Sequence, residues 1–428
     1  MLNCIWIQKK GELQMQLETL FTEALGITAP WKIASLTFDS QKKQLNIEVE
    51  FARGSTFFYE DSETGEKGNY KAYDTVRKTW RHLNFFEHEC YLHVKVPRIK
   101  PKDGGIKMIF PPWSGNVMGF TLLFEAFALE ICRNMPVHQA SRILHTTDHK
   151  LWHVLSCYVE KALGLADHSA VKAIGIDETS IKRGHNYISL FVDLIAKKTI
   201  FITEGKDHKT VTDFAQHLEE QGGKKENIKD VSCDMSPAFI KGVTQELPNA
   251  KITFDKFHIL KIINEAVDSV RRAEAKTNPL LKGARYCFLK NSQNLTKDQK
   301  AKKESLSELK LKSMRALQIR ETFQEIYKAN TFEEFKLLLN KWYFWATHSK
   351  LKPIVKAAKT IKKHWDGILE WKKSQINNGI LEGLNSIIQA AKRKARGYKF
   401  EHFKVIALLL TGKLNLKAIN PYLPTHIS

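Results

Sequence analysis

The chain has 428 residues, which is long enough for two or three domains with a sizeable core. Lysine and arginine total 67 against 46 aspartates and glutamates, so the formal net charge is +21 and the isoelectric point lies near 9.5. This balance favours a polyanionic partner, nucleic acid before an anionic membrane surface. A hydrophobic content of 43% excludes a largely disordered chain.

The cysteines are scattered and form no CxxC pair, which is typical of reduced thiols in a cytosol. They are Cys4, Cys90, Cys132, Cys157, Cys233 and Cys287. The N-terminal stretch lacks the apolar core of a signal peptide, and no apolar run approaches the ~18–20 residues of a membrane span. We therefore expect a cytoplasmic protein with no membrane partner.

Residues 1–112 predict a small β-rich module that follows an N-terminal amphipathic helix ending near Gly26. Alternating or apolar stretches predict strands over residues 32–39, 44–51, 89–100 and 105–113. A polar loop is expected over residues 60–69. Four possible metal ligands lie close together, His82, His88, Cys90 and His93, but their spacing matches no zinc finger, so polar and core roles are favoured.

Residues 113–168 predict a helical segment. A first helix is expected over residues 120–134, and residues 135–163 predict two helices broken at 145–147, with Thr147 or Asp148 capping the second. This is the helix-turn-helix pattern of DNA-binding proteins, although plain helix packing fits equally well. In the DNA-binding case the reading helix would present His149, Lys150 and His153.

Residues 169–273 predict alternating strands and helices. The expected strands cover residues 171–177, 187–194, 198–205, 228–234 and 250–254, and the expected helices cover 209–221 and begin again at Ser236-Pro237 and at Lys256. Three antiparallel strands, a crossover helix and a further strand form the layout of a ribonuclease-H-like sheet. A right-handed crossover would place the fourth strand beside the first, so Asp177 and Asp234 would share one edge.

The C-terminal part predicts helices. Residues 274–372 are poor in glycine and rich in lysine, which favours a helical insertion whose lysines line DNA or form a solvated face. Residues 377–397 predict one helix, in which Glu382 lies at the edge of a buried stripe formed by Ile380, Leu384, Ile387 and Ile388. Residues 373–428 would complete the catalytic core and add C-terminal helices.

Three acidic residues from separate elements stand out: Asp177, Asp234 and Glu382. Taken alone, Asp177 fits a polar strand end that begins a turn. Phosphodiester chemistry, however, needs such a set, because hard cations take carboxylate oxygens. Two ions ~3.5–4 Å apart activate the attacking oxygen and stabilise the leaving one. We therefore interpret the three residues as ligands of magnesium or manganese.

Four segments, in this order, resemble the transposases of the bacterial ISL-three insertion-sequence family, which belong to the DDE class. They are GIDETSIKRGHNY (175–187), CDMSPAFI (233–240), FDKFHI (254–259) and NNGILEGLN (377–385), and RKTWRHLNFFEHECYLHVKVPRI (77–99) is also similar. The resemblance implies a ribonuclease-H-like catalytic domain with a helical insertion, and Asp177, Asp234 and Glu382 as the catalytic triad.

The resemblance also implies a reaction and partners. The reaction would be Mg²⁺-dependent cleavage at terminal inverted repeats, followed by attack of the freed 3′-hydroxyl on target DNA. The partners would be double-stranded DNA, as transposon ends and target, and further copies of the chain in a DNA-bound homo-oligomer. Such a protein would be associated with the bacterial nucleoid.

The N-terminal module departs from the family pattern. Such transposases usually carry cysteine pairs there, which form a zinc finger, whereas the matching places here hold residues 57–61 and 101–104. We therefore expect no zinc, and we expect this module to be stabilised by packing.

Basic residues near the three acids are expected to contact DNA. Lys182 and Arg183 follow Asp177, and Lys392, Arg393 and Arg396 follow Glu382, where they could also answer the helix dipole. His258 forms an Asp-x-x-His pair with Asp255, for which a helix cap with a packed histidine fits equally well.

The favoured hypothesis is a DNA transposase, and three alternatives remain. A structure-specific endonuclease or resolvase would use the same metals but would cut without joining. A catalytically silent DNA-binding descendant of a transposase is disfavoured by the intact acids. A basic membrane-surface protein is disfavoured because no basic amphipathic segment has a strong apolar face.

Overall fold

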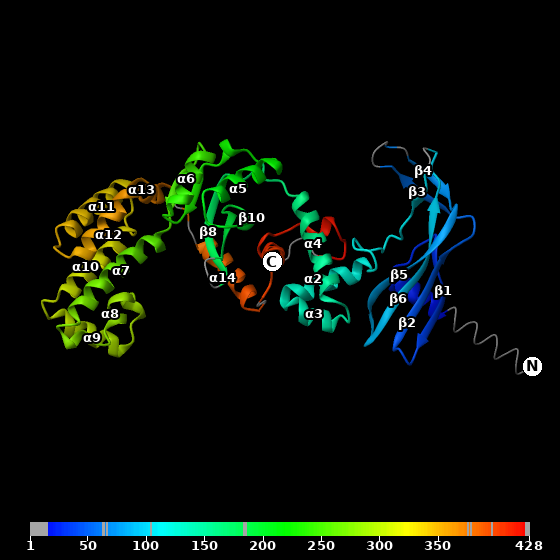
Figure 1. The fold of residues 1–428 in the computed structure, drawn as a ribbon, viewed down its shortest axis with the longest axis horizontal. Helices are drawn as coiled ribbons and strands as arrows, with labels where there is room; N and C mark the ends of the chain where they lie inside the picture. The colour runs from blue at the N-terminus through cyan, green and yellow to red at the C-terminus, as the bar shows by residue number, and fades with distance from the viewer. Residues whose placement is uncertain are drawn as a thin grey trace, which may run out of the picture. The chain divides into compact units, whose positions relative to one another are not determined.

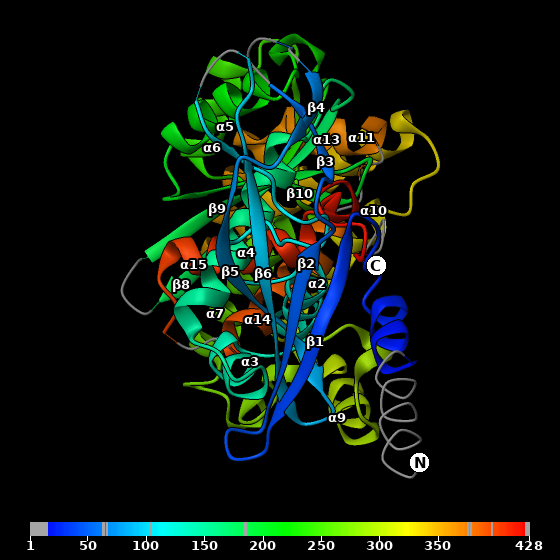
Figure 2. The ribbon, with the colours of Figure 1, turned by 90° about the vertical axis from the view of Figure 1, so that its right-hand side faces the viewer.

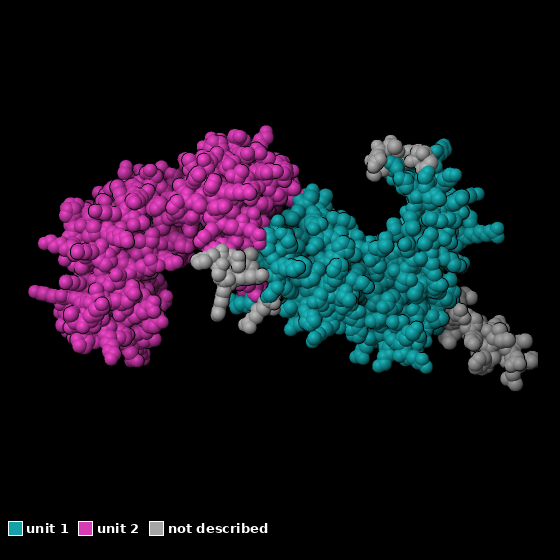
Figure 3. All heavy atoms as spheres, viewed as in Figure 1, with its two compact units in different colours: residues 1–165, 393–428 teal, residues 166–392 magenta. Residues whose placement is uncertain are grey.

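The computed structural model describes residues 16–61, 65, 67–102, 105–182, 186–374, 376, 379–394 and 397–423, with the backbone alone for residues 181, 182, 186 and 394. The chain divides into two compact units, residues 1–165 with 393–428 and residues 166–392, which Figure 3 colours separately. Among these described residues, none of the helices combines the length and the apolar character needed to cross a bilayer.

The first unit contains an N-terminal sheet with the strand order β1-β2-β6-β5, whose strands lie side by side in Figure 2. Its strands are β1 (Trp31–Asp39), β2 (Gln44–Phe51), β5 (Asp74–Phe85), β6 (His88–Ile99) and the short β7 (Lys107–Met108), and β3 (Thr56–Glu60) pairs with β4 (Lys67–Lys71) in a separate hairpin. The strands predicted at 32–39, 44–51 and 89–100 are confirmed. The strand predicted at 105–113 shrinks to two residues, and β3, β4 and β5 were missed.

Packing fills one of the places where the resemblance in the sequence leads us to expect cysteines. Phe57 is buried and meets Phe51 edge-on, with ring centroids 4.9 Å apart, in a cluster that includes Trp31. Beside it the Tyr59 hydroxyl donates to Asp61 Oδ2 at 2.9 Å. Residues 103 and 104 lie outside the described residues, and the absence of zinc stays a prediction.

The helical part of the first unit follows the expected pattern. Its helices are α2 (Leu122–Asn134), α3 (Val137–Ile143), α4 (Asp148–Gly164) and α15 (Phe400–Thr411). The predicted cap is confirmed, because Thr147 Oγ1 accepts from the Lys150 N–H. His149, Lys150 and His153 are exposed on α4. The arrangement is compatible with DNA reading, which stays a prediction.

A buried polar network fastens the C-terminal segment to these helices. The carboxylate of Glu125 on α2 accepts the Tyr158 hydroxyl at 2.7 Å and the N–H groups of Asn116 and Val117. Asn420 Nδ2 donates to the same Tyr158 oxygen at 2.7 Å. Because buried polar groups are costly without partners, this network fixes where residues 397–423 lie within their unit.

The second unit is built on a mixed sheet of order β10-β9-β8-β11-β12. Its strands are β8 (Ala173–Lys182), β9 (Asn186–Asp193), β10 (Lys198–Glu204), β11 (Asp230–Cys233) and β12 (Lys251–Phe254), with α5 (Lys209–Glu220) and α6 (Pro237–Glu246) in the connections. The first three strands are antiparallel, whereas β8, β11 and β12 are parallel. The prediction that the fourth strand lies beside the first is therefore confirmed.

One predicted strand end is wrong. β8 does not stop at Asp177 but continues to Lys182, because residues 177–180 pair with residues 187–190 of β9. Asp177 therefore lies inside a hairpin strand. The parallel pairing of β8 with β11 does end near it, after Gly175 and Ser232.

A helical region extends from the sheet through α7 (Lys256–Glu274), as Figure 1 shows. It contains α8 (Arg285–Leu289), α9 (Lys297–Ser307), α10 (Lys312–Ile326), α11 (Phe332–Thr347), α12 (Lys352–Lys363) and α13 (Trp365–Ser374). Trp342 is buried in its core, where the indole N–H donates to the Ile319 carbonyl at 2.8 Å. The predicted helical character is present, while the exact domain bounds stay a prediction.

The last helix of the second unit, α14 (Gly379–Lys394), packs along β8. A Cβ added at Gly175 would lie 2.8 Å from a methyl carbon of Leu381, so the helix approaches the bare strand backbone closely. The predicted buried stripe is partly wrong, because Ile387 is 44% exposed whereas Leu381 is buried. Residues 377 and 378, the first two of the predicted helix, lie outside the described residues.

Gly367→Ala is expected to destabilise the second unit. The new methyl group would overlap the Phe254 ring and approach the Ile252 carbonyl oxygen to 3.0 Å, where α13 packs on β12. Overpacking of this kind costs about 1–3 kcal/mol, measurable by urea unfolding. Gly383→Ala is the control, because its methyl group meets no atom within 4 Å and the helix gains up to about 1 kcal/mol. Equal stability of the two variants would contradict this packing.

Candidate active site

The ends of two parallel strands bring the first two predicted acids together. β8 and β11 pair with Ala173 opposite Asp230 and Gly175 opposite Ser232. Two residues further along this register, Asp177 comes opposite Asp234, and neighbouring strands are ~4.8 Å apart. Besides burial, the charge of Asp234 raises the pKa of Asp177, so the two carboxyl groups lie within electrostatic reach of each other.

Asp177 sits in surroundings that disfavour its charge. Burial is the main cause that raises the pKa of its carboxyl group to about 6, and the charges of Asp234 and Asp255 raise it further. The Glu178 N–H, which donates to Asp177 Oδ1 at 2.8 Å, and the charge of His258 act in the opposite direction. A cation placed at this carboxyl group would offset the same penalty.

The third parallel strand adds Asp255 and His258 to the same edge. Asp255 caps α7 by accepting the Phe257 N–H at 2.8 Å, and its Oδ2 lies 3.3 Å from His258 Nδ1. The hydrogen bond to Asp255, with the charges of Asp255, Asp234 and Asp177, raises the pKa of His258 against the effect of burial. The helix cap is thus present, and the imidazole also lies within electrostatic reach of both candidate catalytic aspartates.

Glu178 is a carboxylate that sequence reasoning left out. Strand alternation turns its side chain away from that of Asp177. Burial nevertheless raises the pKa of the Glu178 carboxyl group, and the charge of Asp234 adds to that rise while Lys206 and His258 lower it. Glu178 therefore belongs to the electrostatic surroundings of the site. Its position directly after Asp177 was the available signal.

Polar side chains of α14 run along β8. The Asn385 amide donates to Asp177 Oδ2, the Gln389 amide to Thr179 Oγ1, and the Lys392 ammonium to the Ser180 carbonyl. The step of four residues on the helix matches the step of two on the strand, which keeps Asp177 and Thr179 on one face, whereas Lys392 reaches a backbone carbonyl. Asn385, which sequence reasoning missed, is the direct link between α14 and Asp177.

Glu382 lies one helical turn before Asn385 and is exposed. It is therefore carried by the helix that contacts Asp177. Among the described residues, however, no group of three or more His, Cys, Asp or Glu side chains is gathered so that it could hold a metal ion. Asp177 and Asp234 offer the carboxylate oxygens that a hard divalent cation prefers, and these two residues fit such an ion.

The basic residues expected at DNA are placed as follows. Lys392 is half-buried on the Ser180 carbonyl, and Arg393 is exposed at the end of α14. Lys182 is the last residue of β8, and its side chain is not described. Arg183 and Arg396 lie outside the described residues.

Comparison with known proteins agrees with this arrangement. A family model described as "Transposase", of the DDE class and ISL-three type, matches residues 174–407 and so includes the sheet, the helical region and α14. The transposase for insertion sequence element IS1557 of Mycobacterium tuberculosis is 26% identical over 391 residues, which cover 84% of this chain and 86% of that protein. The transposase for IS1001 of Bordetella parapertussis is 25% identical over 338 residues, covering 77% and 82%.

The chain is thus of the transposase class, with its candidate acids inside the matched region. More narrowly, it belongs to the ISL-three family of transposases, because that family's model spans more than half of its length. The family resemblance in the sequence is thereby confirmed.

Asp177→Asn is expected to stabilise the metal-free protein at neutral pH. The folded pKa of about 6 lies above the ordinary value of 3.8 for an aspartate, so the stabilising effect of this group is complete below pH 4 and is lost as the pH rises through 6. The variant has no carboxyl group to ionise, so its free energy of unfolding should exceed that of the wild type by about 1–3 kcal/mol at pH 8 in EDTA. Urea unfolding at pH 8 and pH 4.5 should show the difference shrinking at the lower pH. A difference independent of pH would contradict the shifted pKa.

Asn385→Ala is expected to loosen α14 from β8. It removes a donor from a half-buried carboxylate, which costs about 1–3 kcal/mol. Ser386→Ala, at an exposed neighbouring position on the same helix, should change stability by less than about 0.5 kcal/mol. Chemical unfolding at pH 8 compares the two, and indistinguishable midpoints would remove Asn385 from its linking role.

Proposed function

We propose that this family member is an enzyme that cleaves DNA at the terminal inverted repeats of an insertion sequence and joins the freed ends to target DNA. The observation that carries the proposal is the meeting of Asp177 and Asp234 at one sheet edge, with the helix of Glu382 bonded to Asp177 through Asn385. The names of the relatives support the same reaction class.

The sheet is proposed to be ribonuclease-H-like. The order β10-β9-β8-β11-β12, antiparallel on one side of β8 and parallel on the other, supports this interpretation. In such a sheet the carboxyl ends of the parallel strands gather polar side chains at one edge. The helices between α7 and α14 then form an insertion that separates the third acid from the first two in sequence.

The roles of the acids follow from their chemistry. Asp177 and Asp234 would hold Mg²⁺ or Mn²⁺, with Glu382 supplying a further carboxylate from α14. A divalent ion bound there supplies Lewis-acid stabilisation of phosphate charge and lowers the pKa of an attacking hydroxyl group. His258, whose pKa is raised by its acidic neighbours, is proposed to donate a hydrogen bond to a phosphate oxygen.

The partner is proposed to be double-stranded DNA. The net charge of +21 supports attraction to a polyanion. Lys182, Arg183, Lys392, Arg393 and Arg396 would lie around the cleaved phosphate as contacts to the backbone. Because two transposon ends must be cut and joined together, we propose a homo-oligomer on DNA. The protein would act in the bacterial cytoplasm, at the nucleoid.

Two alternatives differ in what they do to DNA. A structure-specific endonuclease or resolvase would cut with the same acids but would not join. A catalytically silent descendant would bind without cutting. The proximity of Asp177 to Asp234, two carboxyl groups that a divalent ion could bridge, favours a cutting enzyme over the silent descendant.

Asp177→Asn and Glu382→Ala are each expected to abolish cleavage. The assay combines purified protein, Mg²⁺ or Mn²⁺, a labelled duplex bearing the element's own terminal repeat, and an unlabelled target. Each variant should lose at least about a hundredfold in rate, or about 3 kcal/mol of transition-state stabilisation, while binding the repeat within about threefold of the wild type. Glu333→Ala, at an exposed position on α11, is the matched control and should cut normally.

The outcomes separate the candidates. Cutting of the repeat, but not of a scrambled duplex, with joining to the target supports the transposase reaction. Cutting of both duplexes without joining favours the endonuclease. Tight binding without cutting under either ion favours the silent descendant, and a variant that cuts at the wild-type rate removes its residue from the triad.

A further inference from the structure

A groove of about 650 Å³ lies in the helical region, between α7, α8 and α10. One wall is a single face of α7, since Phe257, Lys261, Asn264, Asp268 and Arg272 recur at steps of three and four residues. The face spans 16 residues from Phe257 to Arg272, or roughly 22 Å of helix. The other wall is formed by α8 with the segment after it, and α10 closes the floor.

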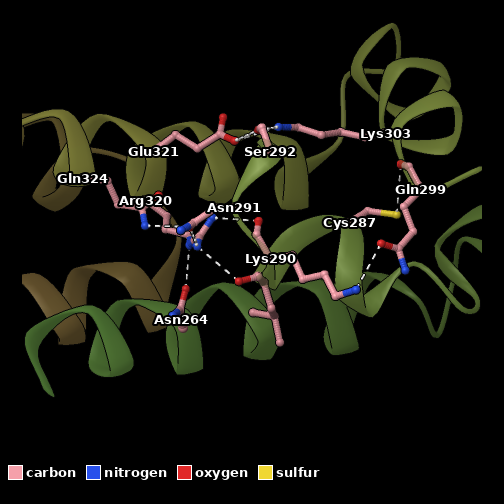
Figure 4. Close-up of polar contacts among 11 residues, drawn as sticks. Asn264, Cys287, Lys290, Asn291, Ser292, Gln299, Lys303, Arg320, Glu321 and Gln324 are labelled. Atoms are coloured by element: carbon pink, nitrogen blue, oxygen red, sulfur yellow. Dashed lines mark hydrogen bonds and ion pairs between the residues drawn. The ribbon is translucent and has the colours of Figure 1, made fainter. Parts of the chain in front are cut away.

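Arg320 of α10 holds the two walls together, as Figure 4 shows. It is 2% exposed, and its guanidinium donates to Asn264 Oδ1 at 2.6 Å on one wall and to the Leu289 carbonyl at 3.1 Å and Asn291 Oδ1 at 3.0 Å on the other. These acceptors are all neutral. The floor therefore carries a positive charge that is fixed in place by hydrogen bonds.

The groove is electropositive beyond this one residue. Its lining includes the cations Lys261, Arg272, Arg285, Lys290 and Arg320, against the acids Glu265 and Asp268. Asp268 is paired with Arg271 at 2.7 Å and with Arg272 at 3.2 Å, so the cations left to a ligand are Lys261, Arg285, Lys290 and Arg320. Lys261 and Arg285 are exposed on opposite walls, and the amide groups of Asn291, Asn294 and Gln324 line the same space. A ligand there would meet positive charge together with amide donors and acceptors.

The groove begins beside the candidate active site. Phe257, which lines its first turn, donates its N–H to Asp255, and His258 follows it directly. The Phe257 ring is 52% exposed. An exposed ring and an exposed guanidinium offer flat surfaces on which bases stack. A strand that leaves the sheet edge along α7 would thus meet the ring first and the cations next.

The size of the groove restricts its occupant. A volume of about 650 Å³ is typical of sites for nucleotide-sized molecules. Unpaired bases are free to stack on an exposed ring, whereas the bases of a duplex are already stacked on one another. We propose that this groove binds unpaired nucleotides of the DNA strand next to the cleavage site. The inference rests on the proposed function, because it takes DNA as the substrate of the neighbouring acids.

The test compares strand and duplex binding by the full-length protein without divalent ions, so that no cleavage occurs. The probes are a fluorescein-labelled 12-nucleotide single strand from the terminal repeat and the duplex of the same sequence, followed by fluorescence anisotropy at fixed salt. Lys261→Ala/Arg285→Ala removes one exposed cation from each wall. Lys356→Ala/Lys359→Ala removes two exposed cations from α12, outside the groove lining, as the matched control.

The groove variant should bind the single strand at least tenfold more weakly and the duplex less than threefold more weakly, with an unchanged melting temperature. The control variant should weaken both probes by the same factor, because loss of general charge acts on all DNA. Equal weakening of both probes by the groove variant, or no weakening of the single strand, would overturn the inference.

Photo-crosslinking gives a second measurement. A single strand carrying 5-iododeoxyuridine should crosslink to peptides within residues 257–294, which mass spectrometry identifies. Crosslinks confined to other segments would overturn the inference that the groove binds the strand. The wild type is also assayed for cleavage of the repeat with Mg²⁺. If the wild type cleaves the repeat but the groove variant binds the single strand as the wild type does, the groove inference alone is wrong. If the wild type does not cleave the repeat, the proposed function is wrong.

Discussion

In the second unit, residues 166–392, the helix α14 packs along the strand β8 through contacts at successive turns, and the candidate active site depends on this packing. Leu381 covers the bare backbone at Gly175, and Asn385 bonds to Asp177 one helical turn later. The close approach is possible because residue 175 has no side chain. Glu382 lies on the same helix, so its position relative to Asp177 depends on the packing of one helix on one strand.

The carboxyl groups at the sheet edge reduce the stability of the fold, but their nearness is what binding of a cation would need. Asp177, Asp234 and Asp255 lie where the parallel pairing of β8, β11 and β12 ends, and burial, with the charges of Asp234 and Asp255, raises the pKa of Asp177. A structure selected for stability alone would avoid this arrangement. The Asp255–His258 pair and the Asn385 amide offset part of the repulsion from the side of the protein.

Local signals in the sequence were sufficient for much of the fold. Period-two alternation located β1 and β2, a threonine cap located α4, and the order of strands and crossover helix placed β11 beside β8, which brought Asp177 and Asp234 together. The sequence analysis did not predict β5, because the inward positions of this strand include Lys78 as well as Trp80 and the alternation of hydrophobicity is lost. The extension of β8 past Asp177 is polar, and it is held by distant partners, the strand β9 and the side chains of α14. The bond from Asn385 to Asp177 has no local signal at all, since 208 residues separate them.

That separation has a consequence for the order of synthesis. The ribosome makes β8 and the rest of the sheet long before α14, so the emerging chain exposes the Gly175 backbone and the Asp177 carboxyl group without their helix. Contacts between such distant segments form late, because the intervening loop must close first. A chain that ends before Gly379 would keep most of the basic residues of the helical region but would lack Glu382 and Asn385. Synthesis thus completes the basic helical region before it supplies the residues of α14 that reach the candidate site.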